Sequence, residues 1–353
     1  MSSQTNPAQP AWDEILAHFQ VGTVRSMRPG GGTAAPKVLV ETDRGRFLVR
    51  ARRPQSSEDA VVAFDHSVIG ALAQAGLPTV APLPAYPTPN PTYSTGPTWV
   101  GDGQVAYEAF PFVEGLESFT PGDREQIASA AHHLARLHQV TADLRPEGSK
   151  PWVREHEIGA MYDTLRGTLE DWHGEGSEVD DARTMLSVAG ELRETLTASL
   201  VASLPQVIIH ADYTPANVMF RGPEVGGIFD FDWVSRQPRV LDVGEAMQFF
   251  AFRRPSPVNP DSIWSLVQAW EPDLDGARTF LRAYQQVWPL SPEEAAALPL
   301  FMRETWLGVR IRAMRKVQPE ERLRILTEGA LRPLRWLEGA TAELPRLVEE
   351  TRP

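Results

Sequence analysis

One block in the middle of the chain constrains the fold most, because it places polar residues directly at the ends of short apolar runs. The apolar runs cover residues 207–209 and 227–229, and the polar residues beside them are Asp212, Asn217 and Asp230. Short apolar runs rich in β-branched residues are typical of buried strands. We therefore expect a rigid scaffold that holds three oxygen-bearing side chains on loops, where reactive groups are commonly positioned.

Phosphoryl transfer is the chemistry that these side chains fit. Asp212 would orient and deprotonate an attacking hydroxyl, while Asn217 and Asp230 would supply the oxygen ligands that Mg²⁺ prefers. His210 would brace the loop by hydrogen bonds. The block thus predicts a kinase that uses ATP and Mg²⁺, with Asp212 and His210 as its catalytic residues and Asn217 and Asp230 as its metal ligands.

The block resembles the superfamily of aminoglycoside phosphotransferases, choline kinases and homoserine kinases. The shared pattern is H-x-D-x-x-x-x-N followed by a strand and [IV]-D-[FWY]; Phe229 at the first position of the closing triplet is a departure. Segment 238–243 is similar to the family's P-x-x-x-D-[LV], whose Asp, here Asp242, steadies the catalytic loop. The resemblance is closest to the homoserine kinase branch. It implies an α+β, two-lobed protein-kinase-like fold with a small β-rich N-lobe and a larger, mainly helical C-lobe.

A phosphatase is the rival interpretation. Asp230, Phe231 and Asp232 also fit the D-x-D-x-[TV] motif of haloacid-dehalogenase-type phosphatases. That fold would need a doubly wound domain after the motif, whereas the rest of the chain has helical patterns. Asp232 is expected to be a turn residue, with a second metal contact as the alternative. A protein kinase is disfavoured, because Phe231 and Asp232 replace the expected Phe-Gly.

Composition limits the partners. The 353 residues are 42% hydrophobic, and the net charge of −12 argues against binding to nucleic acid, which depends on neutralising phosphates. The absence of cysteine excludes disulfides and thiolate chemistry. Because no apolar stretch approaches 18 residues and the N-terminus is polar, we expect a cytoplasmic protein without a membrane partner.

The first part of the chain has the patterns of a nucleotide-binding lobe. A polar tail is expected over 1–11 and a short helix over 12–19, and strands 37–42 and 46–50 flank a glycine-containing turn. A glycine-rich loop before this hairpin would let backbone amides approach phosphates, with a flexible hairpin loop as the alternative. The glycines of this loop are Gly30, Gly31 and Gly32.

A cation on the second hairpin strand completes the expected phosphate site. In the family this strand carries a Lys or Arg, which here is Arg50, and its acidic partner on the helix over 61–72 would be Asp65. A surface Arg is the alternative. The strand that begins at Val105 runs into a hinge that would bind the adenine edge through residues Ala109, Phe110 and Phe112. The N-lobe would therefore cover 12–113.

The C-lobe, 114–353, is expected to be mainly helical. Helical patterns cover 152–173, 181–204, 261–283 and 292–316. The resemblance places the acceptor against the last of these helices, where an Arg could hold a substrate carboxylate through two hydrogen bonds. The candidate acceptor residues are Trp233, Arg303, Trp306 and Arg310. A solvated helix face is the alternative for each Arg.

The acceptor itself stays open at this point. The branch resemblance favours homoserine or a related hydroxy-amino acid. An aminoglycoside would need an acidic rim, which the stretch 175–181 could supply. The alternatives that remain are a choline-like acceptor, a sugar acceptor and a non-catalytic nucleotide-binding module. A homodimer is possible with any of them.

Overall fold

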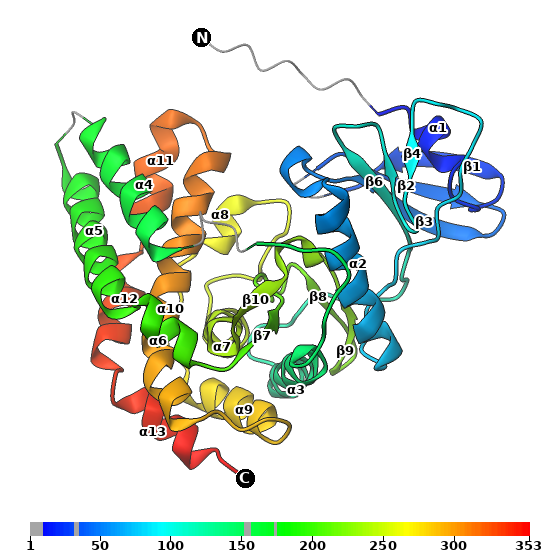
Figure 1. Cartoon of the computed structure of the whole chain (residues 1–353). Coiled ribbons are helices and arrows are strands. Elements are labelled where there is room, and N and C mark those ends of the chain that lie inside the picture. Colours follow the sequence, from blue (N-terminus) through cyan, green and yellow to red (C-terminus); the bar gives the residue numbers. More distant parts are fainter. Residues whose placement is uncertain (1–9, 32–34, 152–156, 173–174) are drawn as a thin grey trace. The chain divides into compact units, whose positions relative to one another are not determined.

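The computed structural model describes residues 10–31, 35–151, 157–172 and 175–353 (Figure 1). These residues form two compact units, which we describe separately. The first unit contains the described residues up to Gln74 together with Thr79–Glu114 and Arg145–Lys150, and the second contains the remainder. Gly32, most of the expected N-terminal tail and the start of the helix expected at 152 lie outside the described residues.

The first unit is built on a six-stranded antiparallel sheet. Its strands, in spatial order, are β1 (Val24–Pro29), β2 (Lys37–Thr42), β3 (Gly45–Ala51), β6 (Ala106–Pro111), β5 (Val100–Gly101) and β4 (Ser94–Thr95). The predicted hairpin is confirmed as β2 and β3. Gly45 has a φ of 134° at their turn, which is a conformation that residues with a Cβ rarely adopt.

The two faces of this sheet have different environments, because successive side chains on a strand point to opposite sides. One face carries a hydrophobic core around Val40, Val49 and Ala109, covered by helix α1 (Trp12–Leu16). The cross-strand neighbours Arg28, Leu39, Leu48 and Phe110 form a row on the other face. Helix α2 (Asp59–Gln74) confirms the helix predicted over 61–72.

The second unit places the predicted apolar runs in two small antiparallel sheets. Strand β7 (Gln206–Ile209) pairs with β10 (Ser235–Pro238), and β8 (Val218–Arg221) pairs with β9 (Glu224–Ile228). The loop that carries Asp212 joins β7 to β8. A 3₁₀ turn, η3 (Phe231–Trp233), follows directly after Asp230. The strands therefore position both ends of the candidate site.

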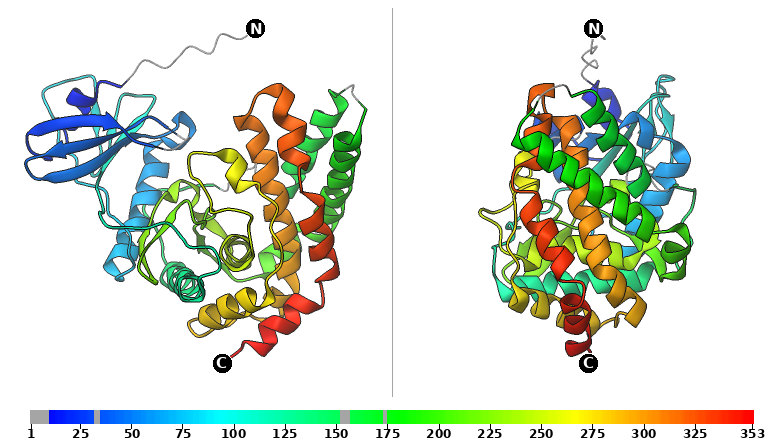
Figure 2. Two further views of the ribbon diagram at one scale, coloured as in Figure 1. Left: turned by 180° about the vertical axis from the view of Figure 1, so that it is seen from behind. Right: turned by 90° about the vertical axis from the view of Figure 1, so that its left-hand side faces the viewer.

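Helices make up most of the second unit (Figure 2). Helix α10 (Pro292–Ala313) packs against α4 (Ile158–Glu170), α5 (Ser177–Thr195), α7 (Arg239–Ala246), α12 (Leu331–Gly339) and α13 (Glu343–Glu350). The other helices are α3 (Arg124–Thr141), α6 (Ala198–Ser203), α8 (Ile263–Leu266), α9 (Leu274–Gln285) and α11 (Arg322–Thr327).

Two of the expected helices are each divided in two. The pattern over 181–204 becomes α5 and α6, because Thr197 leaves the helical conformation and caps α6 by accepting a hydrogen bond from the Leu200 amide. The pattern over 261–283 becomes α8 and α9, where Asp273 caps α9 in the same way through Gly276. Side-chain N-caps thus start new helices at positions where apolar spacing alone predicted one continuous helix. None of the described helices has the length and apolar character needed to cross a membrane.

Candidate active site

A buried carboxylate holds the loop between β7 and β8 from behind. Asp242, at the start of α7, accepts hydrogen bonds from the backbone amides of His210 at 2.7 Å and Ala211 at 2.8 Å. Its Oδ2 also lies 3.1 Å from Nε2 of the buried His138. Ala211 has a φ of 60°, a strained conformation for a residue with a Cβ. The predicted bracing by Asp242 is therefore present, and it fixes the backbone directly before Asp212.

Asp212 and Asn217 form a bonded pair at the end of this loop. The Asn217 side-chain amide donates to the backbone carbonyl of Asp212 at 2.9 Å and to its Oδ2 at 2.8 Å. Burial, together with the negative charge of Asp230, raises the pKa of Asp212 to about 7, against the opposing effects of Asn217, Arg312 and Lys316. The site thus has two mutually repelling carboxylates.

A divalent cation fits this arrangement. The Asn217 amide nitrogen is committed to Asp212, so the amide oxygen is the end available to a metal. Asp230, which adopts a left-handed conformation with a φ of 61°, contributes a carboxylate. No cluster of three or more His, Cys, Asp or Glu that could hold a metal occurs among the described residues. A carboxylate and an amide oxygen suit Mg²⁺, which takes its other ligands from phosphate and water.

His210 supports this site and does not carry a charge into it. Its ring is fully buried, and Nε2 donates to the backbone carbonyl of Phe229 at 3.0 Å. The ring lies against Phe231 with a centroid distance of 4.8 Å. Burial lowers the pKa of His210, which favours the neutral ring. His210 therefore ties the Asp212 loop to the residue before Asp230, as predicted for a bracing histidine.

Charged residues on the first unit form a buried network. Arg50 donates to Glu108 at 2.5 Å, and Asp65 accepts from Arg52 and, at 2.7 Å, from Lys150. Glu108 lies directly opposite Arg50 in the sheet, and Arg52 also donates to it at 3.2 Å. Whether Arg50 and Asp65 act together on a nucleotide stays a prediction. Glu108 was not selected from the sequence, although an acidic residue inside the apolar strand at 105–113 indicates a buried cationic partner.

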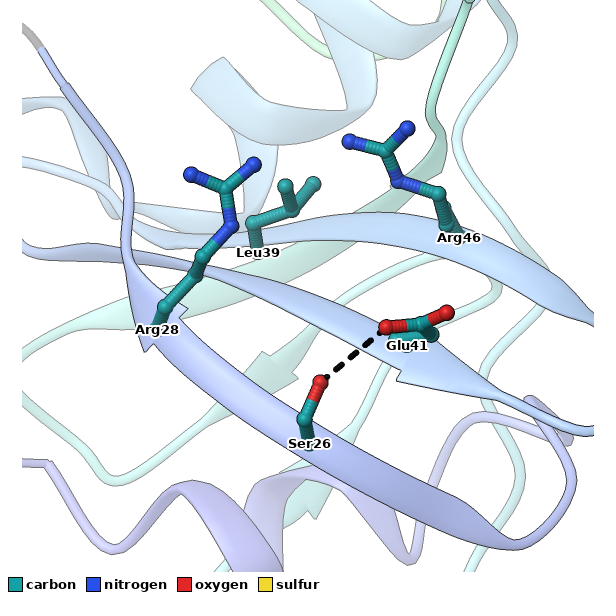
Figure 3. A pocket seen from close by; sticks show the side chains of 5 residues that line it. All are labelled: Ser26, Arg28, Leu39, Glu41 and Arg46. Atoms are coloured by element: carbon teal, nitrogen blue, oxygen red, sulfur yellow. Dashed lines mark hydrogen bonds between the residues drawn. The ribbon is translucent and has the colours of Figure 1, made fainter.

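The face of the sheet that carries Arg50 also has a polar pocket on it. The pocket is lined by Ser26, Arg28, Leu39, Glu41 and Arg46 (Figure 3). Register shows that these side chains lie on the same face as Leu48, Arg50 and Phe110. An apolar strip between two charged rows suits a nucleotide, with the base against the leucines and the phosphates beside the arginines. None of the five pocket residues was predicted as a site residue, whereas Arg50 and Phe110 on the same face were.

The expected phosphate loop and hinge are only partly available for binding. The Gly30 amide donates to the Lys37 carbonyl at 2.9 Å, which closes the loop that contains Gly31. In the hinge, the Ala109 carbonyl accepts from Leu83 at 2.8 Å, and the Phe112 amide donates to Arg46 at 2.9 Å. These two backbone groups have partners within the first unit, and the binding of adenine at this segment stays a prediction. The side chain of Phe110 lies on the same face of the sheet as Leu39 and Leu48.

Three of the predicted acceptor residues on α10 have other roles. Arg303 pairs with Glu191 at 3.1 Å, and the buried Trp306 donates to the Ala330 carbonyl at 3.0 Å. Arg310 is fully buried over the Trp306 ring and donates to backbone carbonyls of the second unit. Their seven-residue spacing was recognised correctly, but it marks a face that packs against other helices. Trp233 is half-buried at the end of η3, three residues after Asp230.

A different face of α10 lies near Asp212. Glu304, Thr305 and Arg312 line a small pocket together with Glu245 of α7 and Ala211 of the catalytic loop. Sequence reasoning did not select these residues, because α10 is buried around most of its circumference and apolar spacing therefore distinguishes no single face.

The braced Asp212 loop and the hydrogen bonds from Asn217 to Asp212 are features expected of a phosphotransferase that uses an alcohol group as acceptor. The chain belongs to the phosphotransferase enzyme family designated APH, whose family model matches residues 27–289. Members of such a family use ATP, and the fold is the two-lobed protein-kinase-like α+β fold that the sequence predicted.

Relatives and solved structures agree with this assignment. Homoserine kinase of Mesorhizobium japonicum is 26% identical over 305 residues, which cover 86% of this chain and 84% of that protein. A microcompartment-associated aminopropanol kinase superposes with a TM-score of 0.59 at 18% identity over 95% of this chain and 96% of its own. Amicoumacin kinase, solved with AMP-PNP and Ca²⁺, gives 0.59 at 14% identity, with coverages of 98% and 94%. The solved structures are similar in fold.

Proposed function

We propose that the protein transfers the γ-phosphoryl group of Mg·ATP to the hydroxyl of homoserine or a related hydroxy-amino acid. The observation that carries the proposal is the contact between Asp212 and Asn217 on a loop braced by Asp242. The acceptor is suggested by the similarity to homoserine kinases over most of the chain.

The residues of the second unit would divide the chemistry among themselves. Asp212 would accept the proton of the attacking hydroxyl, and the hydrogen bond from Asn217 would keep its carboxylate oriented. The Asn217 oxygen and Asp230 would hold Mg²⁺, which when bound neutralises charge on the nucleotide phosphates. His210 would keep the two parts of this site in register through the Phe229 carbonyl.

The residues of the first unit would hold the nucleotide. Leu39 and Leu48 are adjacent on neighbouring strands and would cover the base. Arg50, on the same face as Leu48, would bind phosphate oxygens while Glu108 holds its guanidinium in place. Gly30 and Gly31 would approach the phosphates through their backbones. We place the protein in the cytoplasm, where ATP is available, and leave a homodimer as a prediction.

The test is ADP release from Mg·ATP in the presence of homoserine, other hydroxy-amino acids, choline, a sugar and several aminoglycosides. Homoserine or a close analogue should raise the rate well above the background ATPase, and Asp212→Ala should abolish the increase. Stimulation by a different alcohol alone would replace the acceptor and keep the kinase. ATP binding without turnover on any acceptor would point to a nucleotide-binding module instead.

A further inference from the structure

Two buried carboxylates next to the catalytic loop have oxygen atoms without a hydrogen-bond partner. Glu245 and Glu304 are 4% and 7% exposed, and Oε2 of each has no partner. Both side chains line the pocket that also contains Ala211, the residue before Asp212. Buried carboxylate oxygens are normally paired, because an unpaired one costs its full desolvation penalty. This exception requires an explanation.

Nearby positive charge is insufficient for these two groups. Arg312 is the guanidinium in the pocket lining, and it interacts at the same time with Glu245, Asp212 and Glu304. Burial raises the pKa of Glu245 and of Glu304 to about 8 in each case, although Arg312 opposes both shifts. Within the pocket lining one guanidinium therefore serves both glutamates, and it interacts with Asp212 as well.

The pocket has room for a single small group. Its volume is about 20 Å³, close to what one water molecule or one ammonium group occupies. Ala211 connects the pocket directly to the catalytic loop, and the charge of Asp212 is close enough to raise the pKa of Glu245. A small molecule anchored there by one end would therefore have its other end near Asp212.

We propose that Glu245 and Glu304 bind the ammonium group of the acceptor, so that the enzyme acts on amino alcohols. An ammonium has three donors and no acceptor, which matches two unpaired carboxylate oxygens. It would also add a second positive charge beside Arg312, at a buried place where each charge-assisted hydrogen bond is strong. This inference rests on the proposed kinase function, and it extends that function by naming the chemical group that selects the acceptor.

Three acceptors that differ by one group each test the inference. Homoserine has both an ammonium and a carboxylate, 3-aminopropan-1-ol lacks the carboxylate, and 4-hydroxybutyrate lacks the ammonium. Phosphorylation of each is measured with wild type, Glu245→Gln and Glu304→Gln. Glu338→Gln, at an exposed position of α12, is the matched control. Binding of the same compounds to the ADP complex is measured by calorimetry, so that a result does not depend on turnover.

The inference predicts that the amine-bearing compounds bind and that 4-hydroxybutyrate does not. Each Glu→Gln variant should raise KM, or the Kd, for the amine-bearing compounds at least about tenfold, the loss expected for a charge-assisted hydrogen bond. KM for ATP should stay unchanged, and Glu338→Gln should behave as wild type.

Two results would overturn the inference. The first is equal use or binding of 4-hydroxybutyrate, and the second is an unchanged KM and Kd for amines in both Gln variants that still bind ADP. Either result would leave the kinase function standing. If no alcohol is phosphorylated, the proposed function fails, and the calorimetric comparison of amine-bearing and amine-free compounds still decides about the pocket.

Discussion

The two units treat buried charge in opposite ways. In the first unit Glu108 has no exposed surface, and it is surrounded by donors from Arg50, Arg52 and His66. In the second unit Glu304 is almost as deeply buried, yet one of its oxygens has no partner. The pKa values of the two carboxyl groups differ accordingly. The arginines hold the pKa of Glu108 well below its usual value despite its burial, whereas burial raises the pKa of Glu304 to about 8.

This difference distinguishes buried charges that stabilise the fold from buried charges that can bind a ligand. A hydrogen-bonded network of buried charges orders the side chains around it, and here Glu108 orders Arg50 and Arg52. A buried charge that lacks a partner reduces stability, and such groups cluster where a ligand binds. Four substitutions test this distinction, and the expected effects decrease from the first to the last.

The largest effect on activity is expected at Asp212, the carboxylate that we propose contacts the reacting hydroxyl. Asp212→Ala removes the proton acceptor and should lower kcat by about 10²–10⁴-fold, the usual contribution of a general base. Nucleotide binding should change little, because Asp230 and Asn217 remain. ADP release and a nucleotide titration measure the two quantities. Near-normal turnover would remove Asp212 from its role.

A loss of stability is expected when the paired network is broken. Glu108→Gln leaves two arginines with a neutral partner in a buried place, which should lower the free energy of unfolding by roughly 3–5 kcal/mol. Glu114→Gln is the control, since Glu114 belongs to an exposed ion pair with Arg46, worth at most about 1 kcal/mol. Denaturant titration gives both values, and equal effects would contradict the contrast.

A gain of stability is expected when the buried carboxylate Glu304 is neutralised. The pKa of Glu304 is raised on folding, from 4.5 to about 8, so the folded state favours the protonated form. Its contribution to stability is therefore complete below pH 4.5 and is lost as the pH rises towards 8. Glu304→Gln should remove this dependence and stabilise the protein by roughly 1–3 kcal/mol at pH 8. Unfolding measured at pH 5 and pH 8 tests this, and an equal loss of stability at both would oppose it.

The smallest effect is expected from a methyl group behind Arg312. A Cβ on Gly308 would lie 2.7 Å from Nη1 of Arg312 and 3.0 Å from Cε of Met161, so Gly308→Ala must shift the guanidinium. We expect KM for the acceptor to rise by about twofold to fivefold with KM for ATP unchanged. Gly339→Ala is the control, because nothing lies within 4 Å of its Cβ position. Identical kinetics of the two variants would show that the position of Arg312 is unimportant.

Much of the architecture followed from local patterns. The hairpin of β2 and β3, helix α2, the strands around Asp212 and the long helix α10 all agree with predictions from spacing and turn residues. The loop that carries Asp212 could be predicted for the same reason. Its residues are close in the chain, and their spacing is set by two short strands and the loops between them. The bracing by Asp242 was also expected, because a second motif accompanied the first.

Contacts between distant segments were not accessible in this way. Asp65 accepts from Arg52, which no pattern had selected, and Lys150 reaches Asp65 from a segment that no pattern assigned to the first unit. The residues of α10 that line the pocket beside Ala211 were not selected, because a helix buried on most sides has no distinctive apolar stripe.

The sequence by itself therefore determined the family, the fold class and the candidate catalytic and metal residues, since all of these depend on the order of neighbours along the chain. Only the tertiary structure decided which buried charges meet. Glu245 and Glu304 lie 59 residues apart in the chain and line one pocket because α7 packs against α10. Whether a buried carboxylate has a partner is a property of that packing, because a hydrogen bond requires donor and acceptor to lie within about 3 Å of each other.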